Sequence, residues 1–124
     1  MEPTLEDGDR CLLNRFSYFY ASPKRGDLVV LRDRDESDLA VKRIVALPGE
    51  SVRVSNGNIY VNDRRLPEPY LEHGTMTSAP RWAEQTIHLG GDEYLVLGDN
   101  RAESEDSRFY GPVARGQIVG TLIK

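Results

Sequence analysis

The chain contains few of the residues that build disulfides and metal sites. Its 124 residues include one cysteine, Cys11, which excludes an internal disulfide and a cysteine-rich zinc site. The two histidines, His73 and His88, are not spaced with Cys11 as metal ligands are. We therefore expect no metal, and we expect Cys11 to be a small buried apolar residue rather than a reactive thiol.

Long apolar runs and an excess of positive charge are also lacking. Asp and Glu number 20 against 16 Lys and Arg, giving a net charge of −4, so no broad basic field exists to attract nucleic acid. No stretch approaches the roughly 18 consecutive apolar residues of a membrane-spanning helix. We expect the polypeptide as given to be soluble, and its length fits one domain covering residues 1–124.

Short apolar or alternating runs, broken by Gly, Pro, Asn and Asp, dominate the chain, and helical periodicity is scarce. This pattern predicts an all-β domain. The pair Asn56-Gly57 predicts a tight hairpin turn with positive φ. Residues 63–82 contain several prolines and are expected to form an irregular excursion between strands. The candidate strands cover residues 11–18, 27–32, 39–47, 51–54, 58–61, 84–88, 94–97 and 117–123.

Lys42 is an unusual residue for its position, because the chain has 13 arginines and only 3 lysines, yet a lysine occupies the apolar run 39–47. In a strand, every second residue from Ala40 to Ala46 shares one face, which places Lys42 among small and apolar neighbours. Burial penalises the ammonium and lowers the pKa of a lysine from about 10.4 toward about 5 to 6. A neutral amine can serve as a general base, which arginine cannot. The alternative is an edge lysine whose amine reaches water.

The most polar segment is the loop 98–111, which carries six charges and two serines between Gly98 and Gly111. Taken alone, it has three interpretations: a solvated turn, a calcium loop, or a hydrogen-bonded brace for an active site. Calcium is the weakest, because Arg101 interrupts the acidic residues and the central glycine of an EF-hand loop is absent. The turn and the brace both stay open on the local sequence.

Three segments together resemble the motifs of bacterial type I signal peptidases, in the family's order and over nearly the whole chain. These are membrane-anchored serine endopeptidases that remove signal peptides from exported preproteins. The resemblance implies a partly open, barrel-like all-β fold with a small cap-like insertion at about 63–93, and a Ser/Lys dyad without metal or cofactor. The segments are Met1-Glu-Pro-Thr-Leu5 with Gly8-Asp9, Lys42-Arg43 with Leu47-Pro48-Gly49, and Gly98-Asp99-Asn100 with Ser104, Asp106, Ser107, Arg108 and Gly111.

The resemblance implies a role for each matching residue. Lys42 would be the general base and Ser104 would orient its amine by a hydrogen bond. Asp106 and Arg108 would pair to hold the loop beside the dyad. An extended signal peptide would add as a strand beside residues 39–42, and small apolar walls would suit cleavage after small side chains of the A-x-A type. That pocket would be lined by Met1, Leu5, Cys11, Ala40 and Val41, which could also serve as core residues.

The family's catalytic serine immediately precedes the Met-x-Pro-Thr-Leu element, and this chain begins at that methionine, Met1. We therefore expect the polypeptide as given to lack the nucleophile and to be inactive. The family's transmembrane anchor, which holds the catalytic domain on the extracytoplasmic side of the bacterial cell membrane, would also lie upstream. The self-cleaving SOS repressors also use a Ser-Lys dyad, but the segment 42–49 and the loop 98–111 fit the peptidases better. A plain β binding module would leave Lys42 and this loop unexplained. The alternative that stays open is a non-catalytic signal-peptidase-like assembly or chaperone factor at the cell surface.

Overall fold

The computed structural model describes residues 12–14, 22–32, 39–78, 85–102, 104 and 106–123. Within these residues strands dominate, joined by a four-residue helix, α2 (Ser107–Tyr110), and a 3-10 turn, η2 (Arg115–Gln117). None of the helices described is long and apolar enough to cross a membrane. The strands are β1 (Leu12–Asn14), β2 (Leu28–Arg32), β3 (Leu39–Ala46), β4 (Ser51–Ser55), β5 (Asn58–Val61), β6 (Arg64–Arg65), β7 (Ile87–His88), β8 (Glu93–Leu97), β9 (Val113–Ala114) and β10 (Ile118–Ile123).

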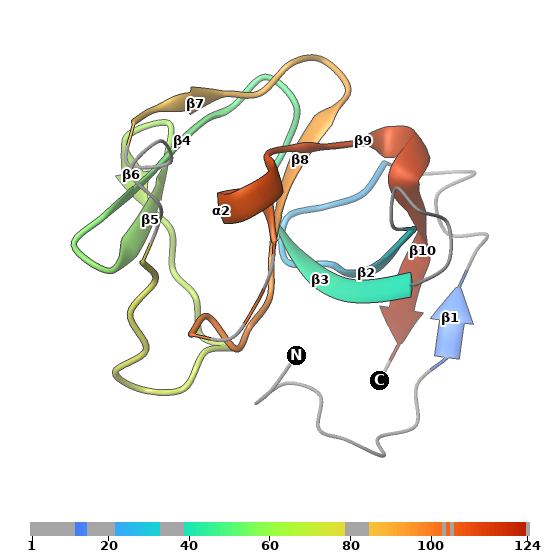
Figure 1. The fold of residues 1–124 in the computed structure, drawn as a ribbon, viewed down its shortest axis with the longest axis horizontal. Coiled ribbons are helices and arrows are strands. Elements are labelled where there is room, and N and C mark those ends of the chain that lie inside the picture. The colour runs from blue at the N-terminus through green and yellow to red at the C-terminus, as the bar shows by residue number, and fades with distance from the viewer. Residues whose placement is uncertain are drawn as a thin grey trace.

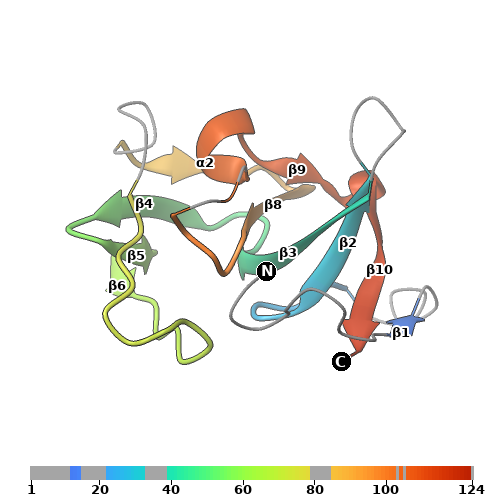
Figure 2. The same ribbon diagram turned by 60° about the horizontal axis from the view of Figure 1, so that its bottom comes forward.

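The strands form two antiparallel sheets, seen at the right and left of Figure 1. The larger sheet has the order β1-β10-β2-β3-β8-β9, and the smaller has the order β6-β5-β4-β7. Helix α2 lies between the two sheets beside β8, and Figure 2 shows the same arrangement after a turn of 60°. Over the described residues neither sheet closes on itself, so the predicted all-β, partly open architecture is confirmed.

Strand β8 is shared by the two hydrophobic clusters of the molecule. Successive side chains of a strand point to opposite faces. Tyr94 and Val96 accordingly pack into the cluster of the larger sheet, while Leu95 and Leu97 pack into the cluster of the smaller one. The larger sheet's cluster comprises Val29, Leu31, Ile44, Tyr94, Val96, Val113 and Ile118. The smaller sheet's cluster comprises Val45, Ala46, Val52, Val54, Ile59, Val61, Leu89, Leu95 and Leu97.

Strand β3 changes register near its end. Against β8 the pairing shifts between Ile44 and Ala46, and both Val45 and Ala46 then pack with the cluster of the smaller sheet. The expectation that every second residue up to Ala46 shares one face is therefore wrong beyond Ile44, because a bulge inserts one residue into one strand of the pair. Lys42 precedes the bulge and lies opposite Val29 of β2.

The β4–β5 hairpin and the segment after it follow most of the sequence expectations. Asn56 and Gly57 have φ of 51° and 80°, which confirms the predicted turn with positive φ. The expected excursion at 63–82 starts later than predicted, because β6 pairs with β5. Residues 66–78 then run without strand or helix, as expected. Residues 79–82 lie outside the described residues, as do the ends of the predicted first strand at 11 and 15–18.

Candidate active site

Lys42 and Ser104 meet although they are 62 positions apart in the sequence. Lys42 Nζ donates a hydrogen bond to Ser104 Oγ at 3.1 Å, in a partly buried setting. The side chain of Lys42 comes from β3, and Ser104 from the loop that follows β8. Gly98 provides the room for this contact. A Cβ atom at position 98 would overlap the side chain of Ser104 and lie 3.6 Å from Lys42 Nζ.

The carboxylate of Asp106 accepts hydrogen bonds from residues near both ends of the loop, Gly98 and Arg108. It is fully buried and accepts two parallel hydrogen bonds from Arg108, Nε to Oδ1 and Nη2 to Oδ2, each at 2.9 Å. Its Oδ1 also accepts from the backbone N–H of Arg108 at 3.1 Å and caps helix α2. Its Oδ2 accepts from the backbone N–H of Gly98 at 3.1 Å. The pair of Asp106 and Arg108 thus holds the loop beside Gly98 and Ser104.

Ser107, the first residue of α2, fastens the helix to β8. Its Oγ is fully buried and accepts a hydrogen bond from the backbone N–H of Val96 at 2.9 Å. This contact places α2 on the strand that leads into the loop. Ser104, in contrast, faces the Lys42 amine.

A second buried ion pair connects β3 to the start of the loop. Arg43, the residue after Lys42, binds Asp99 with Nε to Oδ1 at 2.9 Å and Nη2 to Oδ2 at 2.8 Å. Its Nη1 donates to the carbonyl of Gly26 at 2.8 Å. The Tyr70 ring lies 3.8 Å from the Arg43 guanidinium carbon. The motifs contain both Arg43 and Asp99, but the sequence does not reveal that they pair.

Arg101 links the loop to the irregular segment after β6. Its Nε donates to the carbonyl of Gly98 at 2.7 Å, and its Nη2 donates to Glu68 Oε2 at 2.6 Å. Glu68 Oε2 also accepts from the Tyr70 hydroxyl at 3.0 Å. Burial, and then the charge of Glu68, raises the pKa of Tyr70 above its usual value. Sequence reasoning missed Glu68 and Tyr70 because they flank a proline in a segment without periodicity.

Two of the five residues predicted to line the substrate pocket lie in the described part of the chain. Ala40 and Val41 are half-buried on β3, one and two positions before Lys42. Strand β3 pairs with β2 over 39–43 and with β8 over 43–46. Met1, Leu5 and Cys11 lie outside the described residues. Within the described part of the chain, no group of three His, Cys, Asp or Glu residues is arranged to hold a metal ion.

The fold and the motifs agree with comparisons to known proteins. The family described as "Signal peptidase, peptidase S26" matches residues 1–123. The chain is 40% identical over 126 residues to the probable signal peptidase I-2 of Synechocystis sp., covering 97% of this chain and 56% of that protein. It is 37% identical over 131 residues to the signal peptidase I of Leptolyngbya laminosa, covering 99% and 62%. The chain thus spans less than two thirds of the length of these curated relatives.

A crystal structure of a signal peptidase I from Enterococcus faecalis aligns with a TM-score of 0.67 and 26% identity, covering 81% of this chain and 96% of that chain. The chain belongs to the signal peptidase family, peptidase S26. The resemblance that the three motifs indicate is therefore confirmed, and so is the fold class that it implies.

Proposed function

We propose that this protein is the catalytic domain of a signal peptidase I, a membrane-anchored serine endopeptidase that cleaves N-terminal signal peptides from exported preproteins on the extracytoplasmic side. Lys42 is its general base. The observation that carries the proposal is the 3.1 Å hydrogen bond from Lys42 Nζ to Ser104 Oγ, in a chain that belongs to the signal peptidase family. A base must be held in place if it is to take a proton efficiently, and Ser104 supplies that restraint.

The chemistry follows from a neutral Lys42 amine. The nucleophile is the serine that precedes Met1 in the family pattern. As its oxygen forms a bond to the scissile carbonyl carbon, its proton passes to Lys42 Nζ. The resulting ammonium returns the proton to the leaving amine when the C–N bond breaks. Water then attacks the acyl-enzyme, with Lys42 again accepting and returning a proton. Asp106 and Arg108 keep the loop that bears Ser104 in position.

The substrate is proposed to bind as an extended strand along residues 39–42 of β3. Backbone hydrogen bonds would supply most of the affinity in this mode of recognition, and pockets for alternate side chains would supply the choice. Ala40 and Val41, together with Met1, Leu5 and Cys11, would form the small pocket for the residue before the scissile bond. This arrangement accounts for a preference for small side chains at the cleavage site.

The test compares three proteins on a signal-peptide substrate. They are the chain beginning at Met1, the same chain with a serine and its family-type upstream residues added before Met1, and the extended chain with Lys42→Arg. Only the second should cleave, because a covalent mechanism needs the nucleophile and arginine supplies no titratable amine. Its rate should be unchanged by EDTA. Full activity in the Lys42→Arg protein would show that Lys42 is not the base.

A further inference from the structure

One irregular segment contacts three arginines around the Lys42–Ser104 pair. The segment comprises residues 67–78 and is called the strap below. The Tyr70 ring packs on Arg43, and the Thr77 hydroxyl accepts from Arg101 Nη1 at 2.9 Å. Glu68 binds the same guanidinium through both carboxylate oxygens, at 2.6 and 3.2 Å. The carbonyl of Ser78 accepts from Arg108 Nη1 at 3.0 Å.

These contacts close into a ring that joins β3 to the polar loop. The guanidinium and carboxylate groups in the ring are each at most 9% exposed, and two positive charges face two negative ones. A fully paired, buried network of this kind is rigid, because any displacement leaves a charged group without its partner in a medium of low dielectric constant. In order, the residues that contact one another around this closed network are Asp99, Arg43, Tyr70, Glu68, Arg101 and Gly98.

The ring touches both sides of the proposed base. Arg43 directly follows Lys42 in β3, and Gly98 provides the space that the Ser104 side chain occupies. Fixing Arg43 relative to Gly98 therefore fixes the distance across which the Lys42 amine meets the Ser104 hydroxyl. Tyr70 and Glu68 complete this link from a segment that contributes neither Lys42 nor Ser104.

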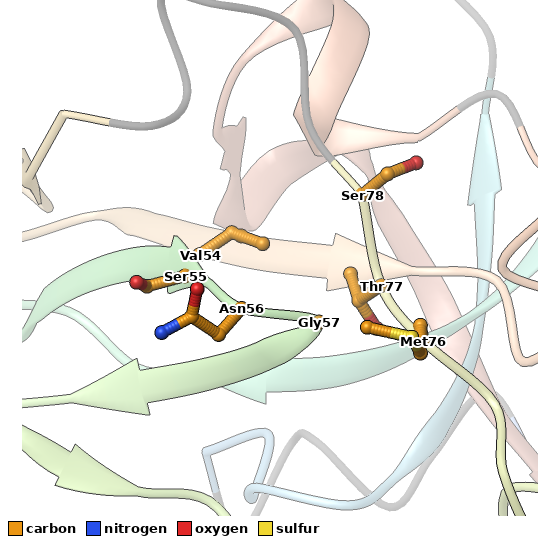
Figure 3. A pocket seen from close by; sticks show the side chains of 7 residues that line it. All are labelled: Val54, Ser55, Asn56, Gly57, Met76, Thr77 and Ser78. Carbon is orange, nitrogen blue, oxygen red and sulfur yellow. The ribbon is translucent and has the colours of Figure 1, made fainter.

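The far end of the strap is anchored on the β4–β5 hairpin. The backbone N–H of Thr77 donates to the carbonyl of Gly57 at 2.9 Å. Met76 packs against the turn so closely that a Cβ atom on Gly57 would lie 2.6 Å from its terminal methyl carbon. Figure 3 shows Met76 and Thr77 beside Gly57 at the tip of the hairpin. The strap is thus held by the smaller sheet while it holds the arginines of the site.

We infer that the strap is a positioning device for the Lys42–Ser104 pair, with Glu68, Tyr70 and Thr77 as positioning residues that act through Arg43 and Arg101. The inference rests on the proposed function, because it concerns the same site. These three residues are not catalytic residues. Their effect is to hold the base in register with the hydroxyl that orients it.

The first test observes Lys42 directly and needs no nucleophile or substrate. The chain contains three lysines, so NMR of lysine labelled at Cε and Nζ yields few signals, and Lys42→Arg identifies the one of interest. In the wild type the Lys42 amine should titrate below the usual lysine value of about 10.4. In Tyr70→Leu its titration midpoint should rise toward that value, because an amine that leaves Ser104 becomes hydrated.

The fold offers a matched control for this variant. Tyr60 packs on Arg53 in the smaller sheet, with the guanidinium carbon 4.3 Å from the ring centre. Tyr60→Leu therefore removes the same kind of stacking contact away from the site and should leave the Lys42 titration unchanged. Tyr70→Phe keeps the aromatic ring on Arg43 but removes the hydrogen bond to Glu68, so its Lys42 titration should lie between those of the wild type and Tyr70→Leu.

The second test measures activity in the serine-extended protein. Glu68→Gln and Thr77→Val should lower kcat by about 10 to 100-fold with little change in KM, because misplacement of a base affects the chemical step more than binding. Thr77→Ser keeps the hydroxyl that accepts from Arg101 and should rescue the rate. Glu50→Gln is the matched control, since Glu50 binds Arg25 through both oxygens at 2.6 and 2.7 Å, and it should stay within about twofold of wild type.

The outcomes separate the two proposals. A Lys42 titration identical in wild type, Tyr70→Leu and Thr77→Val would overturn the positioning role, and so would a wild-type Lys42 midpoint at the usual lysine value of about 10.4. Should Tyr70→Leu fail to fold, the isosteric Thr77→Val carries the same test. If the strap variants move the Lys42 titration while the serine-extended wild type cleaves nothing, the proposed peptidase function fails and the positioning role stands.

Discussion

Position 98 needs a residue without a side chain. A Cβ atom there would overlap the Ser104 hydroxymethyl group, so Gly98→Ala must push Ser104 away from the Lys42 amine. We expect the serine-extended enzyme to lose about 100-fold in kcat, with an unchanged circular dichroism spectrum. Gly116→Ala is the control, because a Cβ at Gly116 has nothing within 4 Å. Equal rates for the two variants would show that Ser104 does not orient the base.

Asp106 is expected to matter for stability as well as for rate. Asp106→Asn leaves the buried Arg108 guanidinium without its counter-charge, which should cost about 3 kcal/mol of unfolding free energy and lower the thermal midpoint. Asp63→Asn is the control, because Asp63 is 91% exposed and lies 3.7 Å from Arg53. Thermal unfolding, followed by circular dichroism, should show a lower midpoint for Asp106→Asn and an unchanged midpoint for Asp63→Asn. Equal midpoints would mean that the pair has little structural weight.

The family motif implies which residues of the polar loop contact one another. Ser104, Asp106 and Arg108 lie in one short loop, and the pairing of Asp106 with Arg108 was expected from the resemblance rather than from local order. Glu68 and Tyr70 could not be placed, since their partners Arg43 and Arg101 lie about 30 residues away on either side. No local pattern connects positions so distant. Their roles emerge only when the chain is folded.

Tyr70 of the strap should make a contribution to stability that is lost at alkaline pH. Burial raises the pKa of Tyr70 in the folded chain above the value of about 10 expected for an unfolded chain. The contribution of neutral Tyr70 is therefore complete below pH about 10 and is lost as pH rises toward the folded-state pKa. Wild type should lose thermal stability relative to Tyr70→Phe between pH 9 and pH 11, measured at constant ionic strength. A difference that stays constant across this range would contradict the half-buried placement of Tyr70.

The regular elements were predictable to different degrees. The β4–β5 hairpin was predictable because Asn56-Gly57 favours one turn type between two alternating runs. The two-residue strands β6 and β9 were not, because two residues carry no periodic signal. The bulge in β3 could not be predicted either, because an apolar run shows the same sequence pattern with or without an extra residue.

The molecule as a whole should unfold in one step. Strand β8 supplies alternate side chains to both hydrophobic clusters, so neither cluster can be lost while the other keeps its strand. We expect Leu97→Ala to lower the unfolding free energy by about 2 to 5 kcal/mol, and Val96→Ala to lower it as well, without separating the transition. Urea unfolding followed by far-ultraviolet circular dichroism and by tyrosine fluorescence should give coincident curves. Two separated transitions would show that the sheets unfold independently.

The order of the strands in the larger sheet lies beyond local sequence reasoning. Strand β1 pairs with β10 near the other end of the chain, with Leu12 opposite Ile123. Pairing at such separation depends on which apolar faces remain to be covered once the hairpins have formed. Local periodicity therefore predicts where strands lie in the sequence, whereas the order of the strands in the sheet depends on the complete set of strands.

Arginine is the cation in five ion pairs among the residues that the structure describes, those with Glu50, Asp99, Asp63, Glu68 and Asp106. Guanidinium groups keep their proton far above neutral pH, whereas an ammonium in a desolvated setting gives it up readily. The charges of these arginine pairs would therefore stay constant over the pH range in which the proposed base, Lys42, gains and loses its proton. In the proposed mechanism, a proton would leave and return at Lys42 in every catalytic cycle while the charges of the surrounding arginine pairs remained the same.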